Sequence, residues 1–300
     1  MNNSSGDDLR DMKQPWEIDF EKSDMLILPQ LSFADHGKET SPSGRLAIYS
    51  RNQSINGTIH LMQNEYASNI SVCLSSFNLS NFLEGMTQAG NISRKKCATV
   101  LCEACNNSNR TICAGRTRFE IKDAENAQSG MYTAYVTQEN SSTVLYAKPL
   151  LIAEGEIILQ MPDRVTSVEP FIPIKMNVTA PENHSKFFVA IMIASGDYEN
   201  ISLSLSDNET TGWPDLILSV ADKSLKIPHP PRVSSGLLMD MLPLLPQNSA
   251  IGLQESVQPG VDVVLMTDRP WEKGEHILTC AAYSPAKGLL GIKQSKIEII

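Results

Sequence analysis

Residues 123–154 read DAENAQSGMYTAYVTQENSSTVLYAKPLLIAE, and this stretch decides the fold class. In its first half Tyr132, Ala134 and Val136 share one face, because successive side chains of a strand point to opposite sides. A polar turn at 139–141 separates that half from TVLYAKPLLIA. Two β-rich segments joined by a short polar turn predict a hairpin at the end of a sheet.

The beginning of this hairpin resembles a known corner. The phrase D-A-x4-S-G-x-Y, which ends at Tyr132, is similar to the E–F corner and F strand of immunoglobulin-like sandwiches. There a tyrosine hydroxyl ties the corner to nearby backbone, and Tyr132 is the matching position. The cysteine that follows in antibody domains is missing, so the resemblance is to the architecture only.

Alternating apolar residues recur on both sides of the hairpin and predict further strands. These are expected at 46–50, 59–61, 70–74, 119–121, 156–160, 172–178, 187–194, 201–205, 216–220 and 261–267, with a second hairpin in 269–300. The run FFVAIMIA at 187–194 is continuously apolar, which predicts a central strand buried on both faces.

The pattern restarts after Glu154-Gly155, which we interpret as a linker. A length of 300 residues suits two domains. We predict a flexible N-terminal segment at 1–23, a β-sandwich domain with a cysteine-rich loop at 24–153, and a second β-sandwich domain at 156–300. The two domains end alike, in SGMYTAYV and KGEHILTC, which suggests two copies of one sandwich type.

One segment departs from the strand period. SSGLLMDMLPLLPQ at 234–247 carries apolar residues at near-helical spacing, and its prolines would end a helix. The predicted fold class is therefore all-β, with two tandem immunoglobulin-like β-sandwich domains and one short helix in the second.

Charge and hydropathy exclude several classes of function. The net charge of −9 argues against nucleic acid as a partner, because binding phosphates requires concentrated Lys and Arg. No stretch approaches 18 uninterrupted apolar residues, so we expect no membrane span within this chain. The first residues, MNNSSGDDLR, lack the basic and apolar parts of a signal peptide, so we expect any export signal to lie outside this chain.

Fourteen N-x-S/T sequons are the strongest compositional signal. Because a glycan is bulky and hydrated, each modified asparagine must lie at the surface of an exported protein. Besides the two at the N-terminus, the glycosylation candidates are Asn52, Asn56, Asn69, Asn78, Asn91, Asn106, Asn109, Asn140, Asn177, Asn183, Asn200 and Asn208.

Six cysteines accompany the sequons: Cys73, Cys97, Cys102, Cys105, Cys113 and Cys280. An even count in an exported chain favours disulfides, although the pairing stays open. Five of the six lie within 73–113, so one of these five must have a distant partner or stay free, and Cys280 is the distant candidate. The C-x4-C-x2-C spacing from Cys97 resembles ferredoxin ligands, which keeps structural zinc or an iron–sulfur cluster as alternatives.

No constellation of catalytic residues is present. The five histidines include no pair with metal-ligand spacing, and nucleophile-elbow, phosphate-loop and dinucleotide motifs are missing. We therefore nominate no catalytic residue, no metal ligand and no cofactor, and expect the protein not to be an enzyme.

The second half resembles a known family. MLPLLPQNSAIGLQES at 241–256 and VVLMTDRPWEKGEHILTCAAYSPAKGLLGIKQSKIEI at 263–299 are similar to the extracellular domain family of methanogenic archaea, found in Methanosarcina-type surface proteins. The resemblance covers about 156–300 and rests on the W-E-K-G turn and the S-P-x-K-G-L-L-G-I-K-Q end. It implies an extracellular or cell-envelope location and supplies no catalytic residues.

The sequence thus predicts an exported glycoprotein module of an archaeal cell envelope, with a structural or adhesive role. Other envelope proteins or polysaccharide are the expected partners. Two alternatives stay open: a carbohydrate-binding accessory module of an envelope enzyme, and a metal or redox protein that uses the Cys97–Cys113 loop.

Overall fold

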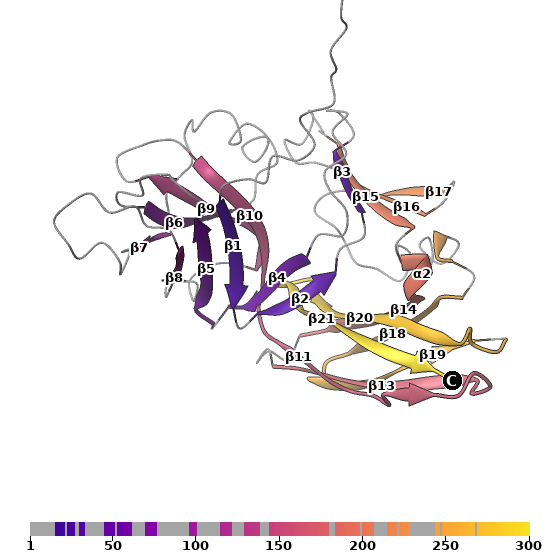
Figure 1. Cartoon of the computed structure of the whole chain (residues 1–300). Coiled ribbons are helices and arrows are strands. Elements are labelled where there is room, and N and C mark those ends of the chain that lie inside the picture. The colour runs from indigo at the N-terminus through magenta and orange to yellow at the C-terminus, as the bar shows by residue number, and fades with distance from the viewer. Residues whose placement is uncertain are drawn as a thin grey trace, which may run out of the picture.

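The structure is a computed structural model of the whole chain. It describes residues 16–21, 23–27, 30–33, 45–51, 53–61, 70–76, 96–100, 115–121, 129–138, 144–179, 184–198, 200–206, 215–220, 223–227, 244–246, 248–267 and 269–300. Strands dominate these ranges, and the one helix among them is the four-residue α2 (Ser195–Tyr198). The predicted all-β fold class is confirmed, and Figure 1 shows the sheets stacked in two β-sandwiches with a smaller sheet beside them.

The first sandwich packs a three-stranded sheet on a larger one. The smaller sheet has the order β1-β5-β8, with β1 (Trp16–Glu21), β5 (Ile55–Leu61) and β8 (Gly115–Ile121). The six-stranded sheet has the order β2-β4-β10-β9-β6-β7, with β2 (Asp24–Ile27), β4 (Arg45–Ser50), β10 (Val144–Ala153), β9 (Gly130–Gln138), β6 (Ile70–Ser76) and β7 (Lys96–Val100). The predicted hairpin of 123–154 is β9 and β10.

The second sandwich repeats this arrangement. Its three-stranded sheet has the order β11-β13-β19, with β11 (Ile157–Gln160), β13 (Phe171–Val178) and β19 (Gly260–Met266). Its five-stranded sheet has the order β12-β21-β20-β14-β18, with β12 (Arg164–Val165), β21 (Gly288–Ile299), β20 (Gly274–Ser284), β14 (Lys186–Ala194) and β18 (Ala250–Ser256). Strand β14 lies between β20 and β18, as its continuous apolar run predicts.

The two sandwiches share one topology. In immunoglobulin letters, the strands A, B and E form one sheet, and A′, G, F, C and C′ form the other in both copies. The A′ strand pairs in parallel with the last strand in each copy, β4 with β10 and β12 with β21. The similar endings of the two predicted domains therefore correspond to equivalent F–G hairpins.

Each copy also carries extra elements at a place of its own. The first insertion follows β1 and contains β2 and β3 (Gln30–Phe33). The second follows β14 and contains α2, β15 (Ile201–Ser206), β16 (Asp215–Val220) and β17 (Lys223–Ile227). The two insertions meet, because β3 pairs in parallel with β15 and completes the four-stranded sheet β17-β16-β15-β3. The sequence pattern did not predict this pairing across the proposed domain boundary.

Each sandwich has its own apolar core, built by alternation. In β13, Ile172, Ile174 and Met176 are fully buried, and the residues between them face solvent. Burying such a side chain contributes about 1.5–3 kcal/mol. The core of the second sandwich draws its other members from both of its sheets, and the core of the first is centred on Ile18, Tyr49, Ile59, Val136 and Ile152.

The helix predicted at 234–247 falls largely on residues 234–243, which lie outside the described part of the chain. Leu244 and Leu245, at its expected end, are described and pack in a cluster with Tyr198 from α2. The helix that the structure describes in the second half is α2, which follows β14 directly.

Candidate functional site

The most elaborate contact among the described residues is the junction between the two sandwiches, so we treat it as the candidate site. It begins at the linker between β10 and β11. The amides of Glu154 and Gly155 donate hydrogen bonds to the carbonyls of Leu289 and Leu290 on β21, at 3.2 Å and 2.7 Å. A Cβ atom on Gly291 would lie 2.9 Å from Ile157, so only glycine permits this close approach. The linker is thus attached to the second sandwich.

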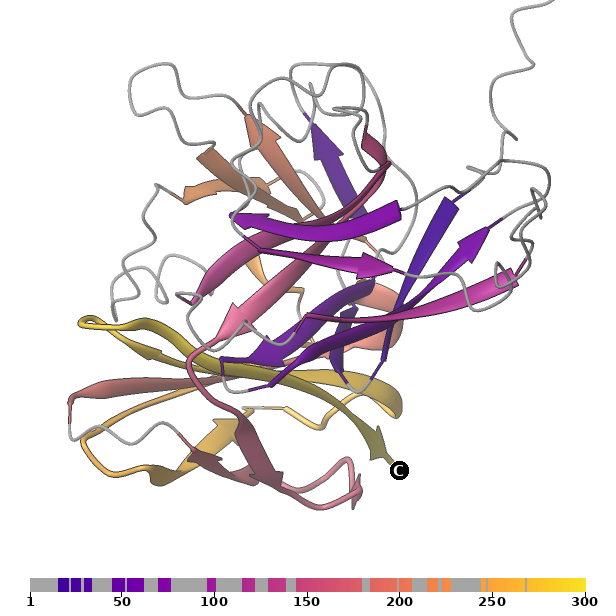
Figure 2. The same cartoon turned by 90° about the vertical axis from the view of Figure 1, so that its left-hand side faces the viewer.

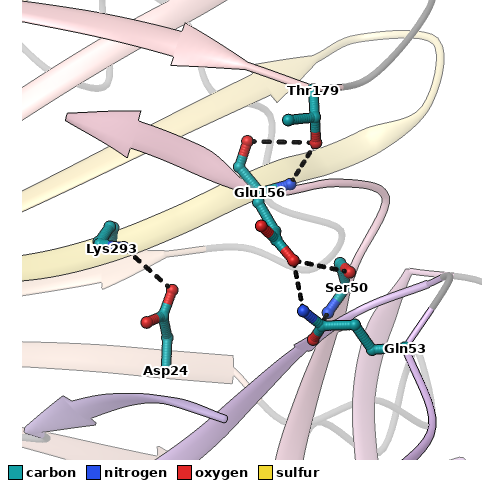
Figure 3. Close-up of polar contacts among 6 residues, drawn as sticks. All are labelled: Asp24, Ser50, Gln53, Glu156, Thr179 and Lys293. Carbon is teal, nitrogen blue, oxygen red and sulfur yellow. Dashed lines mark hydrogen bonds and ion pairs between the residues drawn. The ribbon is translucent and has the colours of Figure 1, made fainter. Parts of the chain in front are cut away.

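A polar cluster holds the linker to the first sandwich (Figure 3). The carboxylate of Glu156 accepts hydrogen bonds from the hydroxyl of Ser50, at 3.4 Å, and from the side-chain amide of Gln53. The guanidinium of Arg51 forms a 3.0 Å ion pair with Glu154. Because Ser50 ends β4 and Arg51 and Gln53 lie in the turn that follows it, both glutamates of the linker are tied back to the first sandwich.

The backbone of Glu156 is held from the other side. Its N–H donates to the hydroxyl of Thr179 at 2.9 Å, and that hydroxyl lies 3.5 Å from the Glu156 carbonyl. Thr179 follows the end of β13, and Figure 3 shows its side chain directed at the Glu156 backbone. Glu156 therefore bridges the two sandwiches, with its carboxylate in one and its backbone in the other.

A second set of contacts surrounds Gln294 on β21. The Ile27 N–H donates to its side-chain carbonyl at 2.7 Å. Its amide nitrogen lies 3.2 Å from the Ile27 carbonyl and 3.0 Å from both the Tyr198 hydroxyl and the Thr279 hydroxyl. One side chain thus satisfies both backbone groups at the end of β2, as a neighbouring strand would do.

Tyr198 strengthens the same contact. Its hydroxyl donates to the Ile27 carbonyl at 2.5 Å while accepting a hydrogen bond from Gln294. Burial raises the pKa of the Tyr198 phenol above its usual value, and the hydrogen bond from Gln294 opposes this effect. The neutral phenol is therefore the form that the junction requires.

Apolar side chains fill the space between the polar clusters. Leu26, Leu46, Ile48 and Leu151, on the outer face of the six-stranded sheet, pack against two side chains of β21, Leu289 and Ile292. Beside them Lys293 lies 3.5 Å from Asp24, an ion pair that Figure 3 shows at the edge of the contact. The junction has an apolar centre and a polar rim, which is the organisation of a specific protein interface.

The structure describes three of the twelve predicted glycosylation sites. Asn56 is half-buried near the start of β5, Asn177 is half-buried on β13, and Asn200 is exposed in the turn after α2. The predicted sites that lie outside the described residues are Asn52, Asn69, Asn78, Asn91, Asn106, Asn109, Asn140, Asn183 and Asn208. None of the three described sites is fully enclosed, which is the geometry that a glycan requires.

The cysteines fall into two groups. Cys73 on β6 is buried and bonded in a disulfide, and the residue directly opposite it on β7 is Cys97. Directly opposite residues of antiparallel strands have Cα atoms about 4.5–5.5 Å apart, within the range of disulfides. The other loop cysteines, Cys102, Cys105 and Cys113, lie outside the described residues.

Cys280 requires a correction. It was the candidate for a distant disulfide partner, but its thiol is free and fully buried. Its side chain points into the core of the second sandwich from the inner face of β20, where it packs as a small apolar residue. Burial raises its pKa to about 12, which disfavours the thiolate that oxidation requires.

Tyr132 was the predicted corner tyrosine, and it packs half-buried against the first core. A tyrosine that sequence reasoning missed, Tyr49 on β4, binds backbone deep in this sandwich. Its buried hydroxyl lies 2.9 Å from the Glu21 carbonyl and 2.8 Å from the Asn56 carbonyl. Burial raises its pKa well above the usual value. The only available signal was a tyrosine in the apolar segment LAIYS.

Within the described residues, His, Cys, Asp and Glu form no group of three or more that could hold a metal ion. No helix in that part of the chain is long and apolar enough to cross a membrane. The Cys97–Cys113 loop, on which the metal and redox alternatives depend, lies outside the described residues except for its first four positions.

Comparisons with known proteins identify no family. No protein-family model and no curated protein matches the chain. One similar solved structure is Escherichia coli alpha-2-macroglobulin activated by porcine elastase, at 12% identity and a TM-score of 0.27. The match covers 95% of this chain and 23% of that one, so this chain spans about a quarter of its length. A likeness at this level carries no argument about function.

Proposed function

We propose that this chain is an exported, non-catalytic glycoprotein module of an archaeal cell envelope, with a structural or adhesive role. The observation that carries the proposal is the junction. Two sandwiches of one topology are joined by a linker whose backbone and side chains are held on both sides, and by a sheet to which both insertions contribute. Such a unit keeps a fixed length and direction, as a spacer or adhesive arm between an envelope and its surroundings must.

The sequons and cysteines support an exported location. Fourteen acceptor motifs and a disulfide at Cys73 fit a compartment in which glycans are attached and thiols are oxidised. The family resemblance of residues 156–300 adds the archaeal envelope to this proposal. Partners would be neighbouring envelope proteins or polysaccharide.

Intact-mass measurement on protein isolated from its native cells tests the proposal most directly. We expect a mass well above that of the 300 residues, which falls on enzymatic or chemical deglycosylation. After alkylation without and with reductant, the mass should also show fewer free thiols before reduction. Unmodified mass together with six free thiols would place the protein inside the cell and overturn the proposal.

A surface-labelling experiment tests the location separately. Intact native cells are treated with a membrane-impermeant amine reagent, and the labelled lysines of this protein are compared with those of a cytosolic protein. Labelling of this protein alone is the expected result, whereas labelling only after lysis contradicts an envelope location.

A further inference from the structure

One face of the second sandwich is unusual for a protein surface. It is the outward face of the three-stranded sheet β11-β13-β19, which lies on the side away from the first sandwich (Figures 1 and 2). Cross-strand pairs on this face are Phe171 with Met266 and Pro173 with Val264. Phe171 is 55% exposed and Met266 is 72% exposed. Large apolar side chains gathered in this way mark a surface that something covers.

The equivalent face of the first sandwich provides an internal comparison. The sheet β1-β5-β8 has the same topology, and its outward positions carry charged and polar residues. His60 lies 2.8 Å from Asp19, and Arg118 lies 3.8 Å from Glu21 across the strands. Because the topology is shared, the apolar character of the second face is a property of its sequence rather than of the fold.

A sequon lies on the apolar face. Asn177, in Asn177-Val178-Thr179, is an outward position of β13, in the same row as Phe171, Pro173 and Lys175. The row therefore begins with a possible sugar attachment point and ends with an exposed aromatic ring. Asn177 lies four positions along the strand from Pro173, a distance of about 13 Å, which a short oligosaccharide can span.

The neighbouring strand holds the Asn177 side chain at a defined place on this face. The residue opposite Asn177 on β19 is Gly260, and the Asn177 side-chain oxygen occupies the space where a Cβ atom would lie, 1.9 Å from its ideal position. Any other residue at 260 would push the carboxamide away. Next in the row, Lys175 and Asp262 are paired across the strands, and both are exposed. They offer a donor and an acceptor to sugar hydroxyls before the apolar pairs begin.

We propose that Asn177 carries an N-linked glycan and that this glycan lies along the outward face of β13 and β19. Its hydroxyls bind Lys175 and Asp262, and its C–H faces pack on Pro173, Val264, Phe171 and Met266. The inference rests on the proposed function, since it requires an exported glycoprotein, and it goes further by assigning one site and the surface that the sugar covers.

Glycopeptide mass spectrometry on native protein separates this inference from the proposed function. Glycans at Asn177 and at Asn200 support the inference and the proposed function alike. A glycan at Asn200 with an unmodified Asn177 overturns the inference and leaves the proposed function standing. The whole chain free of glycans overturns both.

The covering role is tested with matched variants expressed in a glycosylating archaeal host. Asn177→Gln and Asn200→Gln each remove one sequon, but Asn200 lies in an exposed turn away from the apolar face. We expect fluorescence of a hydrophobic dye to rise severalfold for Asn177→Gln and to stay unchanged for Asn200→Gln. Adding Phe171→Ser and Met266→Ser to Asn177→Gln should return the signal to the native level.

Equal dye binding by the two single variants, with Asn177 glycosylated in the native protein, would overturn the covering role. Size-exclusion chromatography tests whether a second copy of the chain, rather than the glycan, covers the apolar face. If the native glycoprotein is a dimer that Phe171→Ser converts to a monomer, a second copy covers this face and the inference is wrong. If it is a monomer, the glycan remains the occupant.

Discussion

Cys280 shows how one residue's environment changes its chemistry. The same residue type is bonded at position 73, on a strand opposite another cysteine, and is inert at position 280. With a pKa of about 12, Cys280 has a thiolate fraction of about one in ten thousand at pH 8. We therefore expect a thiol reagent to leave it unmodified in the folded protein.

Labelling followed by peptide mass spectrometry checks this expectation. Cys280 should react only after denaturant is added, and a Cys280→Ala variant should lose that late signal without losing any other. Rapid modification of Cys280 in native protein would contradict the buried position of this thiol.

Tyr198 gives the junction a pH dependence. Its folded pKa is raised above the usual phenol value, so its contribution to stability is complete below pH 10 and is lost as the pH rises through the folded pKa. The pKa values of Tyr49 and Tyr146 are also raised, so the pH dependence of the native protein contains contributions from all three tyrosines. A Tyr198 variant is needed to separate the contribution of Tyr198. Tyr198→Phe should be less stable at pH 8, and the difference from native protein should shrink between pH 10 and 11.

Denaturant unfolding at several pH values measures this difference. At pH 8 we expect it to be about 0.5–1.5 kcal/mol, the usual contribution of a lost hydrogen bond. A difference that stays constant up to pH 11 would show that ionisation of Tyr198 does not matter to the junction.

At the scale of elements, β7 lies at the end of its sheet and, among the described strands, pairs with β6 alone. A strand in this position has one partner to hold it, and Cys73 and Cys97 face each other across that pairing. We predict that they form a disulfide with each other. Replacing both with alanine should lower the free energy of unfolding by about 2–4 kcal/mol.

Non-reducing peptide mapping tests the pairing itself. A fragment that joins Cys73 to Cys97 is expected, and the Cys280→Ala variant, which keeps both cysteines, should yield the same fragment. A bond from Cys73 to Cys102, Cys105 or Cys113 would refute the pairing.

Strand β5 requires glycine at position 57, where its neighbours β1 and β8 in the same sheet come close. A Cβ atom on Gly57 would lie 2.5 Å from the Phe119 ring and 2.6 Å from the Asp19 carbonyl. Gly57→Ala should therefore destabilise the first sandwich by about 1–3 kcal/mol, because the overpacked strand must shift. Gly196 in α2 has open space around it, so Gly196→Ala should change stability by less than about 0.5 kcal/mol. Thermal unfolding of the two variants side by side is the measurement.

At the scale of the whole molecule, the junction unites two units that each possess a core. Leu289 and Ile292 belong to the contact between the sandwiches rather than to either core. The double variant Leu289→Ser, Ile292→Ser should preserve both cores and loosen the contact. Small-angle X-ray scattering should then give a larger radius of gyration, and calorimetry should resolve two unfolding transitions.

A matched control exists for this experiment. Val168→Ser replaces an apolar residue that is 76% exposed and lies away from the junction, so scattering and calorimetry should match the native protein. If the junction variant also matches the native protein, the sheet shared by the two insertions suffices to hold the sandwiches together.

The all-β class, many of the strands and the two similar hairpins were predictable from the sequence, because period-2 alternation is a local property of a strand that buries one face. The segment 1–23, predicted to be flexible, was wrong over Trp16–Glu21: these residues form β1 of the first sandwich, and Ile18 is fully buried in its core. The alternation at 172–178 and the apolar run at 187–194 led directly to β13 and β14. The sequons and the number of cysteines were equally visible. Of the candidate site, however, only the position of the linker at Glu154-Gly155 was predicted.

Tertiary structure alone decided the rest. Nothing near Gln30–Phe33 in the sequence indicates a parallel pairing with β15, and nothing near Gln294 indicates that its amide would bind Ile27. The sequence around Cys280 likewise does not indicate that its thiol stays free, because the strands that bury this thiol come from distant parts of the second sandwich. These contacts join residues far apart in the chain, and their energies depend on geometry that exists only after both sandwiches have formed.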